Sequence, residues 1–388
     1  MVKIASVTIL SPLPVDPHAP AAILPDLEAA IAGQACFLPL PLADATRATL
    51  LRNTQRAGEP IDPGIALVMS TSGSTGTPKG AQLTPTNLVA SADATHQVLG
   101  GTGQWLLAMP AHHIAGIQVL VRSLVAGVDP LCMDLSEGFD IPTFARAAAE
   151  LDRTGDRTGD RTYTALTPLQ LAKAMDSVAG IDALRTFDAI LVGGAAINPR
   201  LRAAAEELGI AVVATYGSSE TAGGCVYDGR PIPGAQVRVQ DGRILLGGPT
   251  IAHGYRNAPE HEAFREPGWF ATSDGGFIDA GTLTVTGRLD NVIDSGGLKL
   301  HPEALETEIL KVKGVDHACV VGVPHPRLGQ AIMAAYTGWA DIGDILEALE
   351  DAELPRWQIP KDIKRLAEFP TAGPGKIDRR AVARIFGA

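Results

Sequence analysis

The chain has 388 residues and a formal net charge of −11 at pH 7, from 43 acidic and 32 basic side chains. This acidic balance disfavours nucleic acid or an anionic membrane as the main partner, and a small-molecule enzyme is the default expectation. The four cysteines lie far apart and form no C-x-x-C pair, so they predict neither a zinc site nor a disulfide framework. Because no signal-peptide core and no apolar run of membrane-spanning length is evident, we expect a cytoplasmic protein.

Apolar runs alternate with amphipathic stretches along the first two thirds of the chain. The run at 65–70 is typical of a buried strand, and 87–99 has helical spacing. The pattern returns as a strand at 187–194, a helix at 199–209 and a strand at 210–217. The alternation predicts an α/β fold with a large N-terminal domain of α/β layers.

The pattern of apolar residues and glycines changes twice after residue 224. Short β segments with glycine turns, at 237–248 and 281–288, predict a β-rich subdomain that completes the large domain, residues 1–289. Beyond a linker at 288–291, a helix–strand–helix pattern predicts a small mobile α/β domain, residues 290–388. The DRTG repeat at 152–163 favours a solvated surface loop over a phosphate-binding role for its arginines.

The stretch STSGSTGTPKG, residues 70–80, combines hydroxyl side chains, glycines and one lysine, a composition suited to binding a polyphosphate. It does not follow the Walker pattern, because Pro78 stands where a glycine is required and Lys79 precedes Gly80. The spacing of the dinucleotide-binding glycines is absent as well. A polar turn after a strand is the structural alternative.

This loop resembles the signature phosphate loop of the acyl-adenylate-forming enzymes, which include acyl-CoA synthetases, luciferases and peptide-synthetase adenylation domains. Further motifs follow in the family's order as far as Arg379. The resemblance implies that the nucleotide is bound by loop residues Thr71, Ser72, Gly73, Ser74, Thr75, Gly76 and Lys79.

Three more motifs resemble the family's acyl and adenine segments. In MPAHHIAG, His113 corresponds to the gate beside the acyl pocket, although paired histidines are more often structural. GGAAI is similar to the glycine turn against adenine, formed here by residues 193–195, and a helix-entry turn is its alternative. In YGSSET, the resemblance implies roles for Tyr216 on adenine, Gly217 in the turn, Ser219 on phosphate and Glu220 on Mg²⁺. The nucleotide assignments thus include Gly193, Gly194 and Ala195.

The last motifs resemble the ribose, hinge and lysine segments of the family. Asp274, in GWFATSD, corresponds to the carboxylate that accepts both ribose hydroxyls, and Ser273 replaces a glycine that is usual there. Arg288 would reach ribose or phosphate, and Asp290 would be the hinge pivot. Lys376, in PTAGPGKIDR, corresponds to the adenylating lysine.

The resemblance implies an enzyme that adenylates a carboxylic acid with ATP and Mg²⁺ and then transfers the acyl group to a thiol, with free coenzyme A as the expected acceptor. The segments 110–124 and 163–171 look most like the o-succinylbenzoate–CoA ligases of menaquinone synthesis. Arg122 and Thr167 are candidate ligands for the second carboxylate of that acid, and structural roles for both stay open. Ligases for another aryl or fatty acid and a non-catalytic nucleotide-binding regulator are the alternatives, and a homodimer is left open.

Overall fold

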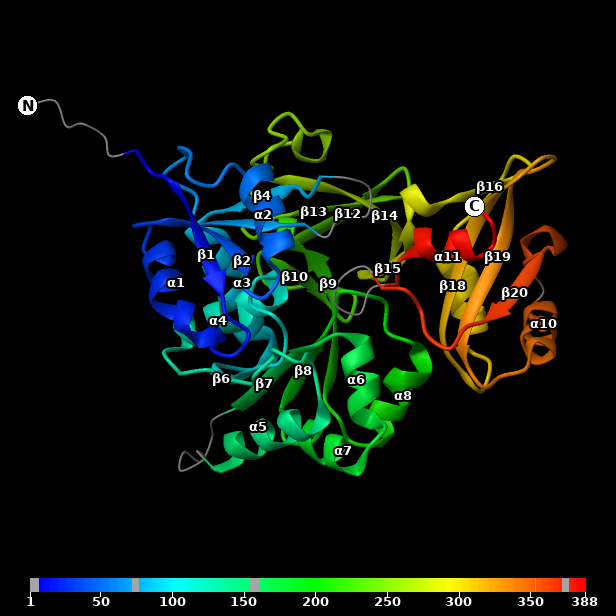
Figure 1. The fold of residues 1–388 in the computed structure, drawn as a ribbon, viewed down its shortest axis with the longest axis horizontal. Coiled ribbons are helices and arrows are strands. Elements are labelled where there is room, and N and C mark those ends of the chain that lie inside the picture. Colours follow the sequence, from blue (N-terminus) through cyan, green and yellow to red (C-terminus); the bar gives the residue numbers. More distant parts are fainter. Residues whose placement is uncertain (1–6, 72–76, 154–160, 353, 372–376) are drawn as a thin grey trace, which may run out of the picture. The chain divides into compact units, whose positions relative to one another are not determined.

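The computed structural model describes residues 7–71, 77–151, 152 and 153 in their backbone, 161–352, 354–371 and 377–388. The predictions for Ser72, Gly73, Ser74, Thr75, Gly76 and Lys376 therefore lie outside the described residues. The chain forms two compact units (Figure 1): Met1–Ile197, Arg202–Val237 and Leu245–Ala271 make up the first, and Asn198–Leu201, Arg238–Ile244 and Thr272–Ala388 the second. The expected domain boundary at 289/290 stays a prediction.

The first unit begins with a four-stranded sheet in the order β1-β2-β3-β4. Its strands are β1 (Leu10–Val15), β2 (Cys36–Pro41), β3 (Leu67–Ser70) and β4 (Gly80–Leu83), accompanied by helices α1 (Leu24–Ile31) and α2 (Ala45–Thr54). The first three strands are parallel, and β3 and β4 form an antiparallel hairpin. Asp44 caps α2 by accepting from Arg47 N at 2.8 Å. The loop predicted to bind phosphate joins β3 to β4.

The second sheet of this unit has seven strands in the order β11-β10-β9-β8-β7-β5-β6. The strands are β5 (Gly103–Leu107), β6 (Leu131–Cys132), β7 (Arg161–Leu166), β8 (Ala189–Val192), β9 (Val212–Ser218), β10 (Gly223–Tyr227) and β11 (Arg230–Pro231). The five strands β5 to β9 run parallel, and β10 and β11 are antiparallel additions. Every residue of β8 is buried, which explains its unbroken apolar sequence.

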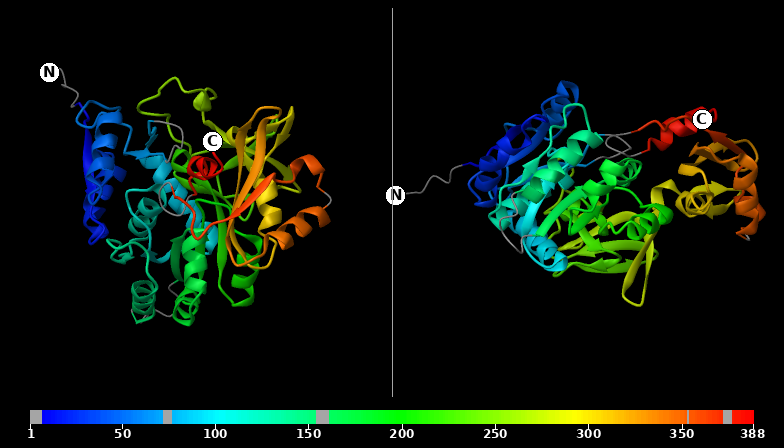
Figure 2. Two further views of the ribbon diagram at one scale, coloured as in Figure 1. Left: turned by 45° about the vertical axis from the view of Figure 1, so that its right-hand side comes forward. Right: turned by 90° about the horizontal axis from the view of Figure 1, so that it is seen from below.

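Six helices accompany this sheet: α3 (Pro85–Leu99), α4 (Ile114–Ala126), α5 (Ile141–Arg153), α6 (Pro168–Met175), α7 (Val178–Leu184) and α8 (Pro199–Glu207). Helices α3 and α4 pack on each other and against β10, and α5 packs on α7. Figure 2 gives two further views of these layers. Threonine hydroxyls cap α3 and α6 through Thr84 and Thr167, each followed by proline at the first helical position.

The β-rich part predicted after residue 224 is a four-stranded sheet in the order β12-β13-β14-β15. Its strands are β12 (Gln236–Gln240), β13 (Arg243–Gly247), β14 (Trp269–Asp279) and β15 (Thr282–Arg288). The division between the two units falls within β12, β13 and β14.

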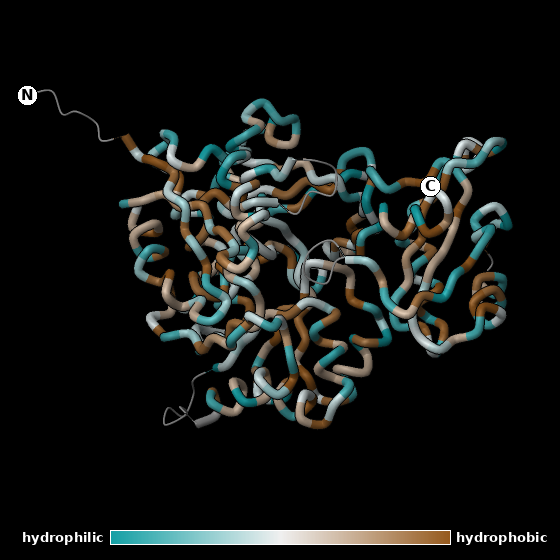
Figure 3. The backbone as a smooth tube through the Cα atoms, in the orientation of Figure 1, coloured by the Kyte–Doolittle hydropathy of each residue, from teal (hydrophilic) through white to brown (hydrophobic). Residues whose placement is uncertain are grey.

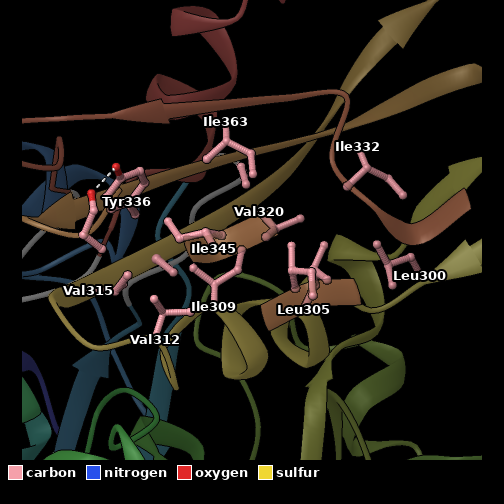
Figure 4. Close-up of a cluster of buried hydrophobic side chains, with 14 of the residues drawn as sticks. Leu300, Leu305, Ile309, Val312, Val315, Val320, Ile332, Tyr336, Ile345 and Ile363 are labelled. Carbon is pink, nitrogen blue, oxygen red and sulfur yellow. Dashed lines mark hydrogen bonds between the residues drawn. The ribbon is translucent and has the colours of Figure 1, made fainter. Parts of the chain in front are cut away.

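The C-terminal part contains a sheet in the order β17-β16-β19-β18, with β20 paired to β19. Its elements are β16 (Ile293–Ser295), β17 (Leu298–Leu300), α9 (Pro302–Ile309), β18 (Val315–His325), β19 (Gly329–Gly338), α10 (Ile342–Asp351), β20 (Asp362–Arg365) and α11 (Arg379–Ile385). Val320 packs into the core drawn in Figure 4, whereas Cys319 and Val321 pack with Val382 of α11. Both faces of the middle of β18 are covered, so the run ACVVGV at 318–323 contains no polar side chain, whereas polar residues stand near its ends.

The predicted fold class, α/β with a small second domain, is confirmed. Hydropathy along the backbone alternates over short distances in both units, as Figure 3 shows. Within the part of the chain that the structure describes, no helix combines the length and hydropathy needed to cross a membrane.

Candidate active site

Several predicted site segments follow the carboxyl ends of adjacent parallel strands in the seven-stranded sheet. The loop after β5 leads to His113, Thr167 follows β7, residues 193–195 follow β8, and Ser219 and Glu220 follow β9. The strands β9, β8, β7 and β5 are neighbours in the sheet. Because ligands of open α/β sheets bind beyond the carboxyl ends of the strands, this edge is the candidate site.

The turn between β9 and β10 is held rigidly by close packing. A Cβ atom on Gly217 would lie 2.1 Å from Gly223 O, so the two strands approach too closely for any other residue. Ala222 adopts a left-handed conformation, and its carbonyl accepts from Ser91 Oγ at 3.0 Å and from Gln118 Nε2 at 2.8 Å. The turn that carries Ser219 and Glu220, the 3-10 helix η2 (Ser219–Thr221), is therefore fixed on the body of the first unit.

Glu220 is a buried carboxylate next to the phosphate loop, with 7% of the residue exposed. Its Oε1 accepts a hydrogen bond of 2.6 Å from the hydroxyl of Tyr255. Its backbone carbonyl accepts from Ala252 N at 2.8 Å. The neighbouring Ser219 Oγ donates to Ser70 O, where β3 ends, at 3.4 Å. These contacts join the turn after β9 to the start of the phosphate loop.

The two ends of the phosphate loop are tied together by hydrogen bonds. Thr71 N donates to Lys79 O at 2.8 Å, immediately before β4 begins. The carbonyl of Pro78 accepts from two side-chain amides, Gln55 Nε2 at 2.7 Å and Asn257 Nδ2 at 2.9 Å. The base of the loop is therefore anchored to two distant parts of the first unit.

The side chain of Lys79 lies between two aromatic rings that the sequence did not single out. Its Nζ is 2.8 Å from His261 Nε2 and 5.1 Å from the centroid of the Tyr255 ring. Burial and the nearby Lys79 charge both lower the pKa of His261. Neither Tyr255 nor His261 falls in a motif, and each meets its partner only through tertiary structure.

The turn assigned to adenine follows β8, next to Tyr216 on β9. A Cβ atom on Gly193 would lie 2.3 Å from Thr215 Oγ1, and Gly194 has a φ of +82°. Both positions thus require glycine, the first for space and the second for its backbone conformation. Because β8 and β9 are parallel neighbours, the turn and Tyr216 lie at the same edge of the sheet. The roles assigned to them stay predictions.

His112 and His113 form a pair of neutral imidazoles at the start of α4. Their ring centroids are 4.2 Å apart, and His113 is the N-cap residue of the helix. Burial lowers the pKa of His112 to about 3 and that of His113 to about 4, with smaller contributions from His113 to the shift of His112 and from Arg47 to both. The imidazole of His113 is therefore uncharged at neutral pH, and in its predicted place beside the acyl pocket it would present a neutral ring to the carboxylic-acid substrate.

The histidines whose pKa is lowered predict a loss of stability in mild acid. Burial also lowers the pKa of His96 to about 4. Since the unfolded chain takes up protons near pH 6.5 and the folded chain does not, the free energy of unfolding should fall as pH drops below 6.5, by up to about 1.4 kcal/mol per pH unit for each histidine. Urea denaturation at about pH 7 and pH 5.5 should show a smaller loss for His112→Asn than for the unchanged protein. Equal losses would contradict this prediction.

Arg122 and Thr167 have structural partners in the first unit. Arg122 is only 3% exposed, and its guanidinium lies 4.9 Å from the centroid of the Trp105 ring. The hydroxyl of Thr167 accepts from Gln170 N at 3.2 Å and caps α6. The geometry supports packing and capping roles first, and their assignment to the second carboxylate stays a prediction.

Asp274, Arg288 and Asp290 form a charged group within the second unit. Asp274 stands opposite Arg288 in the β14–β15 pair, and its Oδ1 is 3.7 Å from Arg288 Nε. Arg288 donates to both carboxylate oxygens of Asp290, from Nε at 2.8 Å and from Nη2 at 2.5 Å. The predicted ribose ligands and the predicted hinge residue are thus in direct contact.

The segment that contains Lys376 is bounded by residues that contact each other. Thr371 forms a β-bridge with Ile377, and Asp378 N donates to Pro370 O at 2.8 Å. The two ends of the segment therefore lie side by side, although Lys376 itself is outside the described residues.

The four cysteines are thiols that burial keeps protonated at neutral pH. Burial raises the pKa of all four cysteine thiols, Cys36, Cys132, Cys225 and Cys319, to about 12. Over the described ranges, no three His, Cys, Asp or Glu side chains are grouped so that they could hold a metal ion. Mg²⁺ commonly binds through one or two carboxylates together with substrate phosphates, so the single carboxylate of Glu220 fits an ion that arrives with ATP.

The fold is that of an α/β enzyme, and the segments predicted to bind nucleotide follow strands at one edge of its parallel sheet. The chain belongs to the AMP-binding enzyme family, whose model matches residues 9–256, and a model of the AMP-binding enzyme C-terminal domain matches residues 304–376. The family resemblance of the motifs is thereby confirmed.

Among relatives, a probable 2-succinylbenzoate–CoA ligase of Mycobacterium tuberculosis (strain ATCC 25618 / H37Rv) is 42% identical over 381 residues, which cover 95% of this chain and 96% of that protein. The 2-succinylbenzoate–CoA ligase of Enterococcus faecalis is 32% identical over 83% of this chain and 70% of its own length. The structure of o-succinylbenzoate CoA synthetase from Bacillus subtilis, in complex with its acyl-adenylate intermediate, has the same fold, with a TM-score of 0.80, 21% identity, and coverage of 97% of this chain and 89% of that one.

Proposed function

We propose that this enzyme is an AMP-forming acid–thiol ligase that converts 2-succinylbenzoate, ATP and coenzyme A to 2-succinylbenzoyl-CoA, a step of menaquinone biosynthesis. The observation that carries the substrate assignment is the 42% identity to a probable 2-succinylbenzoate–CoA ligase over nearly the full length of both chains. The site geometry supports the reaction class, since a carboxylate and an ammonium are held at the base of a hydroxyl-rich loop.

In the first half-reaction, the substrate carboxylate attacks the α-phosphorus of ATP. An oxygen–phosphorus bond forms, the bond to pyrophosphate breaks, and acyl-AMP remains. Negative charge grows on the phosphoryl oxygens, so fixed cations and donors accelerate the step. Lys79, Ser219 and Lys376 would bind those oxygens, Glu220 would hold Mg²⁺, and Asp274 and Arg288 would bind ribose. Bound Mg²⁺ supplies further neutralisation of the phosphate charge.

In the second half-reaction, the thiolate of coenzyme A attacks the acyl carbon. A carbon–sulfur bond forms, the carbon–oxygen bond breaks, and AMP leaves with the electron pair. On the acyl side of the site, a neutral His113 would not form an ion pair with the substrate carboxylate that holds it back from attacking ATP in the first half-reaction. We assign the change between the half-reactions to a rotation of the C-terminal domain about Asp290.

An ATP–pyrophosphate exchange assay with a panel of acids tests the proposal. Exchange that requires Mg²⁺ and 2-succinylbenzoate, and that is weak with benzoate and octanoate, is the expected result. Exchange with a different acid would keep the ligase class and discard the substrate. ATP binding without exchange, whichever acid is added, would favour the nucleotide-binding regulator. The cytoplasmic location and the homodimer remain predictions from the sequence.

A further inference from the structure

One short segment of the first unit, residues 252–261, contacts both Glu220 and Lys79. These are the two charged side chains proposed to bind Mg²⁺ and the phosphates of ATP. The hydroxyl of Tyr255 donates to Glu220 Oε1 at 2.6 Å, and its ring centroid is 5.1 Å from Lys79 Nζ. His261 Nε2 lies 2.8 Å from the same Nζ atom. Two side chains six residues apart therefore set the positions of an anion and a cation that come from separate parts of the chain.

The backbone of this segment is fixed relative to both partners. Arg256 N donates at 2.8 Å to the carbonyl of Gly80, the residue directly after Lys79. Ala252 N donates at 2.8 Å to the backbone carbonyl of Glu220. The segment thus pairs on one side with β4, the strand that begins directly after the lysine, and on the other side with the turn that carries the glutamate. Small shifts of Tyr255 would be transmitted to both groups.

The ring of Tyr255 has little freedom to move. It is 3% exposed and makes edge contacts with His261 and Phe264, each with a centroid distance of 5.0 Å and with interplanar angles of 84° and 81°. A phenol that donates to a carboxylate forms a charge-assisted hydrogen bond and uses only one of the roughly four lone-pair directions of that carboxylate. Glu220 is thereby oriented while keeping oxygen lone pairs for a cation.

His261 is an unusual partner for Lys79, because it accepts from the ammonium without cancelling its charge. A carboxylate in this place would neutralise the lysine and compete with phosphate. Ala263 N also approaches His261, with 3.2 Å to Nδ1. A neutral imidazole has one acceptor nitrogen, so the ring satisfies only one of these two donors at a time. The Lys79 ammonium is therefore held in place by His261, and it keeps its charge for an ion pair with phosphate.

We propose that Tyr255 and His261 are positioning residues for nucleotide binding, in which Tyr255 orients the Glu220 carboxylate toward Mg²⁺ and His261 holds the Lys79 ammonium ready for the phosphates of ATP. This inference rests on the proposed function, since it assigns how that site meets its polyphosphate.

The test compares Tyr255→Phe and His261→Ala in ATP–pyrophosphate exchange, with the concentrations of Mg²⁺, ATP and acid varied in turn. Loss of a hydrogen bond to a charged group should raise the half-saturating Mg²⁺ concentration of Tyr255→Phe about tenfold, and the KM for ATP of His261→Ala about tenfold, with the KM for the acid unchanged. His261→Gln, which retains a polar acceptor, should recover part of the ATP affinity.

Two variants of matched chemistry serve as controls. Tyr163→Phe removes a buried hydroxyl that donates to Leu99 O and Gly101 O, and His253→Ala removes an exposed histidine from the same segment. Neither should change the Mg²⁺ or ATP dependence.

A double-mutant comparison decides whether His261 acts through Lys79. In a Lys79→Ala background, adding His261→Ala should have no further effect on the KM for ATP. Independent, multiplying effects would overturn the inference, as would an equal rise in the KM for the acid. Calorimetric titration of the same variants with ATP and Mg²⁺ measures nucleotide affinity without catalysis. This inference can therefore fail or hold in the titration whether or not the protein catalyses the proposed reaction.

Discussion

Lys376→Ala is expected to reduce acyl-AMP formation at least about a hundredfold, the scale of losing one group that stabilises transition-state charge, while leaving thioester formation from supplied acyl-AMP largely intact. The reason is that substitution at the α-phosphorus, with departure of pyrophosphate, takes place only in the first half-reaction. The ends of the segment that carries Lys376 are held together by the contact of Asp378 N with Pro370 O and by the bridge between Thr371 and Ile377.

Single-turnover assays of the two half-reactions check this prediction. The exposed Lys361 of the same unit supplies the control, and Lys361→Ala should leave both rates unchanged. If Lys376→Ala slowed both half-reactions equally, the lysine would not be specific for adenylation, and its assignment would be wrong.

The second large effect is expected on stability, from Arg379→Met. Arg379 donates to both carboxylate oxygens of the buried Glu306, at 2.6 and 2.7 Å, and its Nη1 donates to Val320 O at 2.8 Å. Glu306 Oε1 accepts a further hydrogen bond of 2.6 Å from Val320 N. Removing the guanidinium leaves a carboxylate buried without its cation, which typically costs about 3–5 kcal/mol.

Chemical denaturation of the purified variants measures this cost. Replacing both partners, Glu306→Met with Arg379→Met, should recover much of the stability, because no buried charge is then left alone. Breaking the exposed pair of Lys311 with Glu308 by Lys311→Met should cost less than about 1 kcal/mol. A loss for Arg379→Met no larger than that of Lys311→Met would refute the account of the buried pair.

Much of the fold could be predicted because the buried strands have short, continuous apolar sequences. The run AILV of β8 is apolar throughout, since both faces of the sheet are covered, and the turn of glycines after it marks the carboxyl end of the strand. The strand predicted at 210–217 likewise precedes Ser219 and Glu220. The structure adds β5 before His113 and shows that β5, β7, β8 and β9 are parallel neighbours, so that these segments lie at one edge of the sheet.

The supporting contacts of the site could not be predicted, because they join positions far apart in sequence. His261 and Lys79 are separated by 182 residues, and Arg379 and Glu306 by 73. These contacts depend on how a strand such as β4 pairs with a segment far away in the sequence. The spacing of apolar residues within one segment does not encode that pairing. For Arg122 the sequence suggested a functional role that the contacts do not require. Its positive charge made it a candidate for binding the acid, but its side chain is buried near Trp105 and Tyr227 inside the first unit.

Mass spectrometry of the products tests the central claim most directly. The purified protein would be incubated with 2-succinylbenzoate, ATP and Mg²⁺, with and without coenzyme A, beside benzoate, octanoate and a sample without acid. We expect AMP and 2-succinylbenzoyl-CoA in the complete mixture and acyl-AMP when coenzyme A is omitted, with neither product in the sample without acid. A thioester formed only with another acid would contradict the substrate, and the absence of AMP with every acid would contradict the ligase itself.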